Sequence, residues 1–164
     1  MAEIVTTYYH SPVGVLRISA GEHFVSGVHF HNDKEIPASG NEMTPMLIQC
    51  IEQLIQYFQG ERRVFDLPIN QEGTAFQKDV WTELMTIPYG KTISYLDLAK
   101  KLGDPKSTRA VASANGRNNI SIIVPCHRVI GSNRELIGYG GGLWRKKFLL
   151  DLEMRVAHGV QTLF

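Results

Sequence analysis

The stretch that decides the fold runs from residue 94 to residue 116 and reads SYLDLAKKLGDPKSTRAVASANG. A serine cap at its start opens a short helix, which Gly103 ends. Asp104 and Pro105 are typical of the start of a second helix, and Gly116 stops that helix after about Asn115. Two short helices joined by a tight, glycine-containing turn predict a helix-turn-helix, although many helical hairpins that bind no DNA share this pattern.

The second helix is predicted to present small side chains around one arginine. At 3.6 residues per turn, Thr108, Arg109 and Ala112 lie on one side, and Val111 and Ala114 lie on the other. A helix this slim can approach a phosphate backbone or the floor of a groove, which favours DNA binding. An ordinary surface arginine on an alanine-rich helix is the alternative.

We predict two domains, residues 1–72 and 73–164, because the segment NQEG (70–73) is typical of a linker and the charge changes there. Residues 1–72 carry four basic against nine acidic side chains, and residues 73–164 carry thirteen against seven, within a net charge of +1. Such asymmetry indicates a polyanionic partner for the basic half, or attraction between the halves.

The N-terminal half is predicted to be a small α/β domain. EIVTTYYH, GVLRISA and FVSGVHFH are rich in β-forming residues and are separated by turn residues, which indicates an antiparallel β-meander. Thr44 and Pro45 then open a helix that Gly60 ends, and VFDLPI (64–69) is a further candidate strand. Thr74 and Gln77 form a capping box at the first helix of the mainly helical C-terminal half. The fold class is therefore α+β.

Composition places the chain among ordinary globular proteins. It has 164 residues, 43% hydrophobic and 20% charged. No apolar run approaches the roughly 20 residues that cross a bilayer, and the first residues lack the features of a signal peptide. We expect a cytoplasmic protein, associated with the nucleoid or located in the nucleus depending on its source, with free thiols at Cys50 and Cys126.

Chemistry concentrates in ISIIVPCHRVIGS, residues 120–132. The apolar run 120–124 predicts a buried strand that ends at Pro125, directly before Cys126. Zinc is disfavoured because neither cysteine has a ligand pair at zinc spacing, and no C-x-x-C redox motif is present. Burial of Cys126 as core filling is the serious alternative, because free cysteine is among the most buried residue types.

A nucleophilic role for Cys126 is favoured by its neighbours. Pro125 cannot continue a sheet ladder, so we expect the chain to turn there and expose the residues that follow. His127 and Arg128 provide an electropositive setting that favours a thiolate, and a thiol next to a histidine base is the usual form of an activated sulfur nucleophile. Glu153, late in a predicted helix from residue 143 to 154, is the candidate carboxylate that orients His127, with plain solvation as the alternative.

IIVPCHRVIG (122–131), followed by GYGGGLWRKKFLLDLE (138–153), resembles the signature of the O6-alkylguanine-DNA alkyltransferases, which remove alkyl groups from guanine directly. The resemblance extends upstream through PYGKTISYLDLA and STRAVASANGRN and covers essentially residues 73–155. The N-terminal half resembles that family's small α/β domain only loosely. The resemblance implies a winged helix-turn-helix-like DNA-binding motif in the second half.

The resemblance also implies roles for individual residues. Cys126 would accept the alkyl group in an SN2 step, and His127 would take the thiol proton through a water. Glu153 would orient His127, Asn118 would brace the active-site turn, and Tyr95 would donate a proton to guanine N3. Further implied contacts come from the backbone of Val129 and Gly140 at the base edge, Tyr139 as a pocket wall, Arg109 inside the duplex in place of the flipped nucleotide, and Thr108, Ala112 and Ser94 at the DNA.

The implied partner is double-stranded DNA that contains O6-alkylguanine, with O4-alkylthymine as a further substrate, bound by a monomer with no cofactor, no metal and no membrane. The thioether product is stable, so each chain is expected to act once. Asn119 stands where the family commonly has proline, which predicts a looser turn, and Gly140 stands where serine or alanine is common, which would admit larger alkyl groups. A Cys–His hydrolase and a non-catalytic helix-turn-helix regulator are the competing interpretations.

Overall fold

The computed structural model describes residues 3–32, 35–36 and 43–159. The chain divides by its internal contacts into two compact units, Met1–Gln71 and Glu72–Phe164. This division falls one residue before the boundary that the linker and the charge distribution predict.

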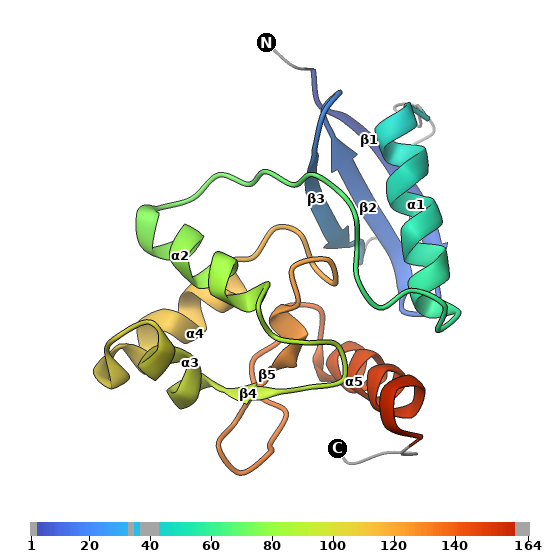
Figure 1. The fold of residues 1–164 in the computed structure, drawn as a ribbon. Helices are drawn as coiled ribbons and strands as arrows, with labels where there is room; N and C mark the ends of the chain where they lie inside the picture. The colour runs from blue at the N-terminus through green and yellow to red at the C-terminus, as the bar shows by residue number, and fades with distance from the viewer. Residues whose placement is uncertain (1–2, 33–34, 37–42, 160–164) are drawn as a thin grey trace. The chain divides into compact units, whose positions relative to one another are not determined.

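The first unit is a three-stranded antiparallel sheet with one helix on it. β1 (Val5–Ser11), β2 (Gly14–Ala20) and β3 (Val25–Phe30) pair in that order, as the β-meander predicted. α1 (Pro45–Phe58) begins at the Thr44 cap and runs along the sheet, in contact with all three strands (Figure 1). Leu16 and Ile18, two apart on β2, are fully buried, as is Cys50 on α1. One face of the strand and one face of the helix therefore form a common core.

The expected strand at residues 64–69 is wrong. This segment forms only an isolated bridge between Ile69 and Val25. Pro68 has no N–H for a ladder, and its carbonyl accepts from the Val25 N–H at 2.9 Å. The Gln53 side chain on α1 bonds both backbone groups of Asp66, since its Oε1 accepts from the Asp66 N–H and its Nε2 donates to the Asp66 carbonyl. The Gln53 side chain therefore makes the hydrogen bonds to Asp66 that a neighbouring strand would otherwise make.

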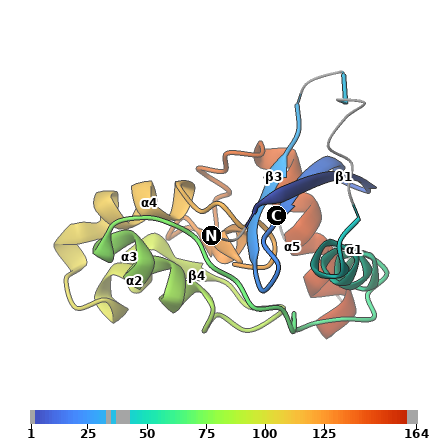
Figure 2. The same ribbon diagram turned by 90° about the horizontal axis from the view of Figure 1, so that it is seen from above.

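The second unit is mainly helical. Its elements are α2 (Ala75–Leu84), β4 (Ile93–Ser94), α3 (Tyr95–Lys101), η1 (Pro105–Ser107), α4 (Thr108–Gly116), η2 (Cys126–Arg128), β5 (Val129–Ile130) and α5 (Leu143–His158). α4 packs on both α2 and α3, and the three helices gather on one side of this unit (Figure 2). β4 and β5 form a two-stranded parallel pair that brings the start of α3 next to the residues after Cys126.

The predicted caps position the helices of the second unit. Thr74 and Gln77 form the reciprocal capping box on α2, and the Ser94 hydroxyl accepts from the Asp97 N–H at the start of α3. The helix predicted from Pro105 is split, because Asp104 caps the short 3₁₀ turn η1 and α4 begins only at Thr108. The helix-turn-helix is thus α3, η1 and α4.

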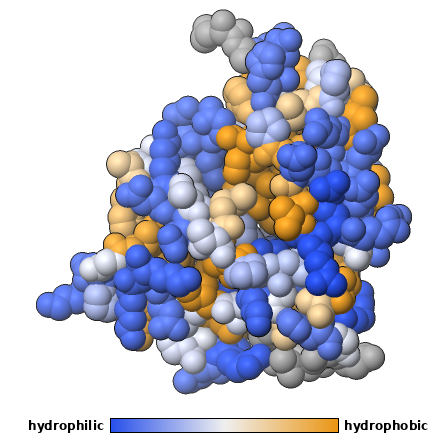
Figure 3. Space-filling view, viewed as in Figure 1, coloured by the Kyte–Doolittle hydropathy of each residue, from blue (hydrophilic) through white to orange (hydrophobic). Residues whose placement is uncertain are grey.

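The surface is mixed in character. Hydrophilic residues cover much of the face shown in Figure 3, with smaller apolar areas between them. In the described ranges, none of the helices combines the length and the apolar character that crossing a membrane requires.

Gly90 is the backbone position that ties the segment before β4 to α5. It has φ = +75°, and a Cβ built on it would lie 2.6 Å from the Cβ of Ala157. We expect Gly90→Ala to lower the free energy of unfolding by about 1–2 kcal/mol for the left-handed backbone and by about 1–3 kcal/mol more for overpacking. Gly103→Ala is the matched control, since Gly103 has φ = +99° with nothing within 4 Å of the added Cβ. Urea unfolding of the two variants checks this, and equal losses would show that α5 does not pack closely on Gly90.

Candidate active site around Cys126

Cys126 and His127 lie in the 3₁₀ turn η2 and are buried rather than exposed. Cys126 is 6% exposed, and His127 and Glu153 are fully buried. The expectation that Pro125 would expose the residues after it is wrong. Residues 120–124 do not form a strand that ends at Pro125, and both they and the residues that follow are buried.

Residues 120–124 are buried as predicted, but they form a turn and not a strand. Ile122 has φ = 72°, a left-handed conformation that no strand contains. The Asn118 side chain holds this turn: its Nδ2 donates to the carbonyls of Val124 at 2.9 Å and Ile120 at 3.3 Å, and its Oδ1 accepts from the Ile120 N–H. A side chain therefore satisfies the backbone groups that a sheet would have paired.

His127, Glu153 and Arg128 form a buried cluster between η2 and α5. The Nε2 of His127 lies 2.7 Å from Oε2 of Glu153, and Nε of Arg128 lies 2.8 Å from Oε1. Burial opposes ionisation of Glu153, but the charges and hydrogen bonds of His127 and Arg128 outweigh it and lower the pKa of that carboxyl to about 2. Glu153 is therefore ionised at neutral pH and can only accept hydrogen bonds.

The ionised Glu153 determines which nitrogen of His127 carries the proton. Burial lowers the pKa of His127, so the ring is neutral at pH 7, even though Glu153 opposes this shift. Because the carboxylate requires a donor, the proton lies on Nε2 and leaves a lone pair on Nδ1. Within the described part of the chain, no hydrogen-bond partner reaches this buried Nδ1. The imidazole is thus oriented with its basic nitrogen available.

The Cys126 thiol is not ionised at rest. Burial raises its pKa, while the Asn118 side chain, the Lys146 charge and Tyr139 act in the opposite direction without reversing it. The expectation of a resting thiolate in an electropositive setting is therefore wrong. A reaction at this sulfur has to include removal of its proton.

Lys146 is the member of this site that the sequence reasoning missed. It is fully buried, and its Nζ donates to the Ile137 carbonyl at 2.8 Å and to the Tyr95 hydroxyl at 3.4 Å. Burial lowers its pKa to about 8, although Cys126 acts to raise it. The available signal was spacing: Lys146 and Glu153 are seven residues apart on α5, which places them on the same helix face.

Two of the four residues expected to hold a base, Tyr95 and Tyr139, are close enough to Cys126 for it to affect their pKa values. Burial raises the pKa of the Tyr95 hydroxyl to about 12, and this hydroxyl donates to the carbonyls of Ile137 at 3.0 Å and Gly138 at 3.2 Å. Burial raises the pKa of the Tyr139 hydroxyl, and the nearby Cys126 raises it further. Val129 is fully buried in β5. The remaining member, Gly140, has nothing within 4 Å of a built Cβ.

The candidate DNA-binding residues are separate from this cluster and lie on the helix-turn-helix. Arg109 is exposed on α4, and Thr108 and Ala112 are half-buried beside it. Ser94 is occupied as the cap of α3. The exposed basic side chains around these helices are Lys100, Lys101, Lys106, Arg109 and Arg117. This basic surface is suited to a phosphate backbone.

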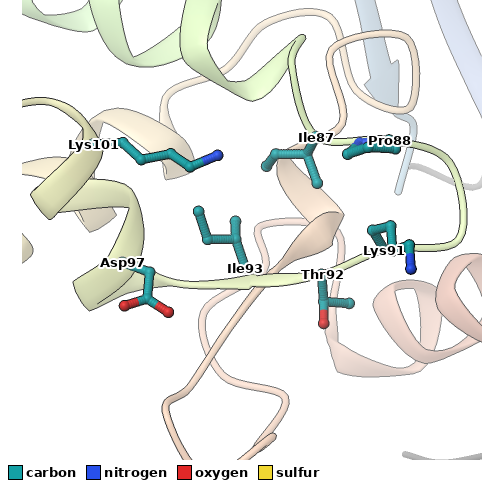
Figure 4. Close-up of a pocket in the computed structure, with 7 residues that line it drawn as sticks. All are labelled: Ile87, Pro88, Lys91, Thr92, Ile93, Asp97 and Lys101. Atoms are coloured by element: carbon teal, nitrogen blue, oxygen red, sulfur yellow. The ribbon is translucent and has the colours of Figure 1, made fainter.

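A pocket of about 430 Å³ lies beside β4 and α3 (Figure 4). Its lining consists of Ile87, Pro88, Lys91, Thr92, Ile93, Asp97 and Lys101. Neither Cys126 nor any residue expected to hold a base contributes to it, so we assign the base no place there.

Comparison with known proteins gives a family match over nearly the whole chain. Residues 4–71 match the family model of the 6-O-methylguanine DNA methyltransferase ribonuclease-like domain, and residues 75–155 match the model of its DNA binding domain. A methylated-DNA–protein-cysteine methyltransferase of Methanosarcina acetivorans is 47% identical over 88% of this chain and 95% of its own length. One of Mycolicibacterium paratuberculosis with the same name is 42% identical over 94% of each chain.

Solved structures agree with this match. The crystal structure of Mycobacterium tuberculosis O6-methylguanine methyltransferase has a TM-score of 0.84 and 39% identity, covering 96% of this chain and 97% of that chain. A structure of the M. tuberculosis protein OGT in complex with DNA also has a TM-score of 0.84, with 40% identity over 92% of this chain and 93% of that chain.

Proposed function

The chain belongs to the 6-O-methylguanine DNA methyltransferase family and acts on methylated DNA in direct-reversal repair by transfer to a cysteine, and from this premise we propose that Cys126 is the acceptor. Cys50, the other cysteine, is fully buried on α1, and burial raises its pKa to about 12.

The proposed reaction is an SN2 displacement. A water between the thiol and Nδ1 of His127 passes the thiol proton to the imidazole, and the resulting thiolate attacks the carbon on guanine O6. The S–C bond forms as the C–O6 bond breaks, and the electron pair moves onto the base. Proton donation by Tyr95 to guanine N3 keeps the leaving base neutral, so no full negative charge develops on it.

The observation that carries this proposal is the pairing of His127, the residue after Cys126, with an ionised Glu153 at 2.7 Å, which leaves Nδ1 as a buried lone pair. A buried imidazole nitrogen without a protein donor is a suitable site for a bridging water. Glu153 stabilises the imidazolium that forms, in the manner of the carboxylate in a catalytic triad. Because the thiol is neutral at rest, this base is required for the reaction.

Access to the sulfur requires a rearrangement. The Tyr95 hydroxyl has to leave the Ile137 and Gly138 carbonyls before it can donate to a base. The lesion also has to leave the stack, which costs a few kcal/mol and less at a damaged pair. We propose that the segment 131–142 opens as the flipped base enters.

Stoichiometry tests this proposal against hydrolysis. A thioether has no route to release here, so methyl transfer is expected to stop at one group per chain. Counting methyl groups transferred from excess O6-methylguanine DNA checks this, and continued release of product beyond one per chain would favour a Cys–His hydrolase.

We propose that Arg109 enters the duplex in place of the flipped nucleotide, with Thr108, Ala112 and Ser94 at the DNA backbone. Arg109→Ala is expected to slow repair of duplex DNA by about tenfold or more, because no side chain then occupies the space that the flipped nucleotide leaves in the duplex. The reaction with free O6-benzylguanine, which needs no flipping, is expected to change little. Single-turnover rates on both substrates measure this, with Lys106→Ala as a control on the same motif, and equal losses on both substrates would contradict the role of Arg109.

The remaining expectations are part of the same proposal. We propose that residues 1–72 and 73–164 are the two domains, that the protein binds DNA as a monomer, and that it needs no cofactor or metal. O4-alkylthymine is proposed as a second substrate. We also propose that Gly140, which has no side chain where serine or alanine is common, allows alkyl groups larger than methyl.

A further inference from the structure

The sheet of the first unit has a second face, opposite α1. Leu16 and Ile18 are fully buried toward α1, so the residues that alternate with them on β2 point the other way (Figure 1). The pairing register carries this face across the sheet, with Arg17 on β2 between Tyr8 on β1 and His29 on β3. Arg17 is exposed and the other two are half-buried. We call this side the outer face of the sheet.

The next row of the outer face contains two more histidines. His10 on β1 pairs with Val15 on β2, and the His31 N–H donates to the Val15 carbonyl at 2.9 Å. The rings of Tyr8 and His31 meet edge to face, with centroids 5.0 Å apart. Nε2 of His31 also lies 3.0 Å from the Glu35 carbonyl, which fixes this ring. The outer face therefore gathers one tyrosine, one arginine and three histidines.

The row on the other side of the arginine consists of small residues. Thr6, Ser19 and Gly27 lie in register there, and the Thr6 and Ser19 hydroxyls are 3.1 Å apart in a hydrogen bond. A Cβ built on Gly27 would lie 3.0 Å from Cε1 of His29, so the imidazole leans over the glycine. The rings thus have low neighbours on the sheet.

The charge on the three strands has one sign. β1, β2 and β3 contain no aspartate or glutamate, although residues 1–72 carry nine acidic against four basic side chains. Arg17 is the one lysine or arginine on these strands. It and His10 are both exposed and can donate hydrogen bonds to an anion. The outer face is therefore complementary to an anionic partner within an otherwise acidic unit.

Rings and a guanidinium on a low sheet surface suit one class of anion. Unpaired bases stack on tyrosine and histidine rings and on the arginine plane, and arginine also binds phosphate. The bases of a duplex cannot stack on such a face, because their neighbours in the helix cover them.

We propose that the outer face binds single-stranded nucleic acid, with bases on the rings of Tyr8 and His31 and a phosphate on Arg17. This site lies in the first unit, whereas Cys126 and the helix-turn-helix lie in the second. It is a binding function beyond alkyl transfer and does not depend on the proposed function.

The test follows the backbone amide signals of the isotope-labelled full chain by NMR while a short single strand is added. Oligothymidylate is used in one arm and oligouridylate in the other, so the two arms distinguish DNA from RNA. Binding of either strand is expected to shift amides of β1, β2 and β3, and the titration of these signals gives the dissociation constant at the sheet. A duplex of the same length is expected to leave them nearly unchanged.

Two variants test the named contacts. Arg17→Gln and Tyr8→Leu are each expected to weaken binding at the sheet by about fivefold or more, with no change in methyl transfer from duplex DNA. Arg63→Gln is the matched control, because it removes an exposed positive charge from the same unit outside the strands. It is expected to leave the dissociation constant unchanged. If Tyr8→Leu fails to fold by circular dichroism, Arg17→Gln decides, since the Arg17 side chain is exposed.

Four results would overturn the inference. The strand amides could remain unshifted with both oligonucleotides, or shift equally with the duplex. Arg17→Gln and Arg63→Gln could lose equal affinity, which would indicate general attraction to charge. Shifts confined to the second unit that disappear in Arg109→Ala would assign the single strand to the helix-turn-helix instead. Failure of methyl transfer, by contrast, would leave the shifts at the sheet unchanged.

Discussion

Cys126→Ala is expected to abolish methyl transfer from O6-methylguanine DNA while duplex binding remains close to that of the unaltered protein. The sulfur is the atom that forms the new bond, so no residual route exists without it. Cys126 is 6% exposed, whereas the basic side chains of α3 and α4 that are expected to meet DNA are exposed. Gel-based binding and single-turnover transfer, measured on the same preparation, separate the two properties.

Two matched variants sharpen this prediction. Cys126→Ser keeps the size of the side chain but offers an oxygen that His127 cannot deprotonate effectively, so it is also expected to be inactive. Cys50→Ala removes the other thiol, which is fully buried on α1, and is expected to retain full transfer. Transfer that survives in Cys126→Ala and disappears in Cys50→Ala would show that Cys50, and not Cys126, is the acceptor.

Glu153→Gln is expected to have the largest combined effect on stability and rate. The carboxylate neutralises Arg128, which is 6% exposed, and fixes the tautomer of His127. Removing one partner of a buried ion pair costs about 3–5 kcal/mol because the other charge stays buried. An amide can also donate to Nε2, which would move the proton to Nδ1 and remove the base, so transfer is expected to slow by about a hundredfold or more.

The pKa of Glu153 predicts how this loss depends on pH. Its value of about 2 in the folded protein lies below the ordinary glutamate pKa of 4.5. A depressed carboxyl pKa stabilises the fold above the unfolded pKa, and this contribution, about 3 kcal/mol, disappears as the pH falls from about 4.5 to about 2. The stability difference between the wild-type protein and Glu153→Gln is therefore expected to be largest near neutral pH and to narrow in that window.

Asp151→Asn is the control for both effects. Asp151 lies on the same helix and pairs with Lys147 at 2.6 Å, but this pair is partly exposed, so its loss is expected to cost under about 1 kcal/mol. Denaturant unfolding from pH 2 to pH 7 measures all three proteins. If Asp151→Asn and Glu153→Gln lose equal stability, the cluster of His127, Glu153 and Arg128 is not the buried network described above.

Local signals in the sequence predicted the elements well. The caps at Thr44, Thr74 and Ser94 were readable because each is a short-range contact between a hydroxyl and a nearby N–H. The meander and the two helices of the helix-turn-helix were predictable because β-forming residues, turn residues and glycine stops are also local signals. Glu153 was the candidate partner of His127, 26 positions away, from its place late in a predicted helix, and the resemblance in residues 73–155 implied the same pairing.

Features that depend on tertiary contacts were not predictable. The apolar run 120–124 forms a turn because Asn118 binds its backbone, and sequence periodicity does not show such side-chain bonds. The pKa of Cys126 is raised because the folded unit buries it, whereas the neighbouring residues suggested the opposite. Lys146 looks like an ordinary surface lysine until α5 and η2 are assembled around the sulfur.

The most direct test is a mass spectrum of the intact and proteolysed protein after incubation with an excess of duplex DNA that contains O6-methylguanine. We predict a gain of one methyl group per chain, carried entirely by the peptide that contains Cys126. An unmodified protein, or a methyl group on Cys50 or any other residue, would contradict it.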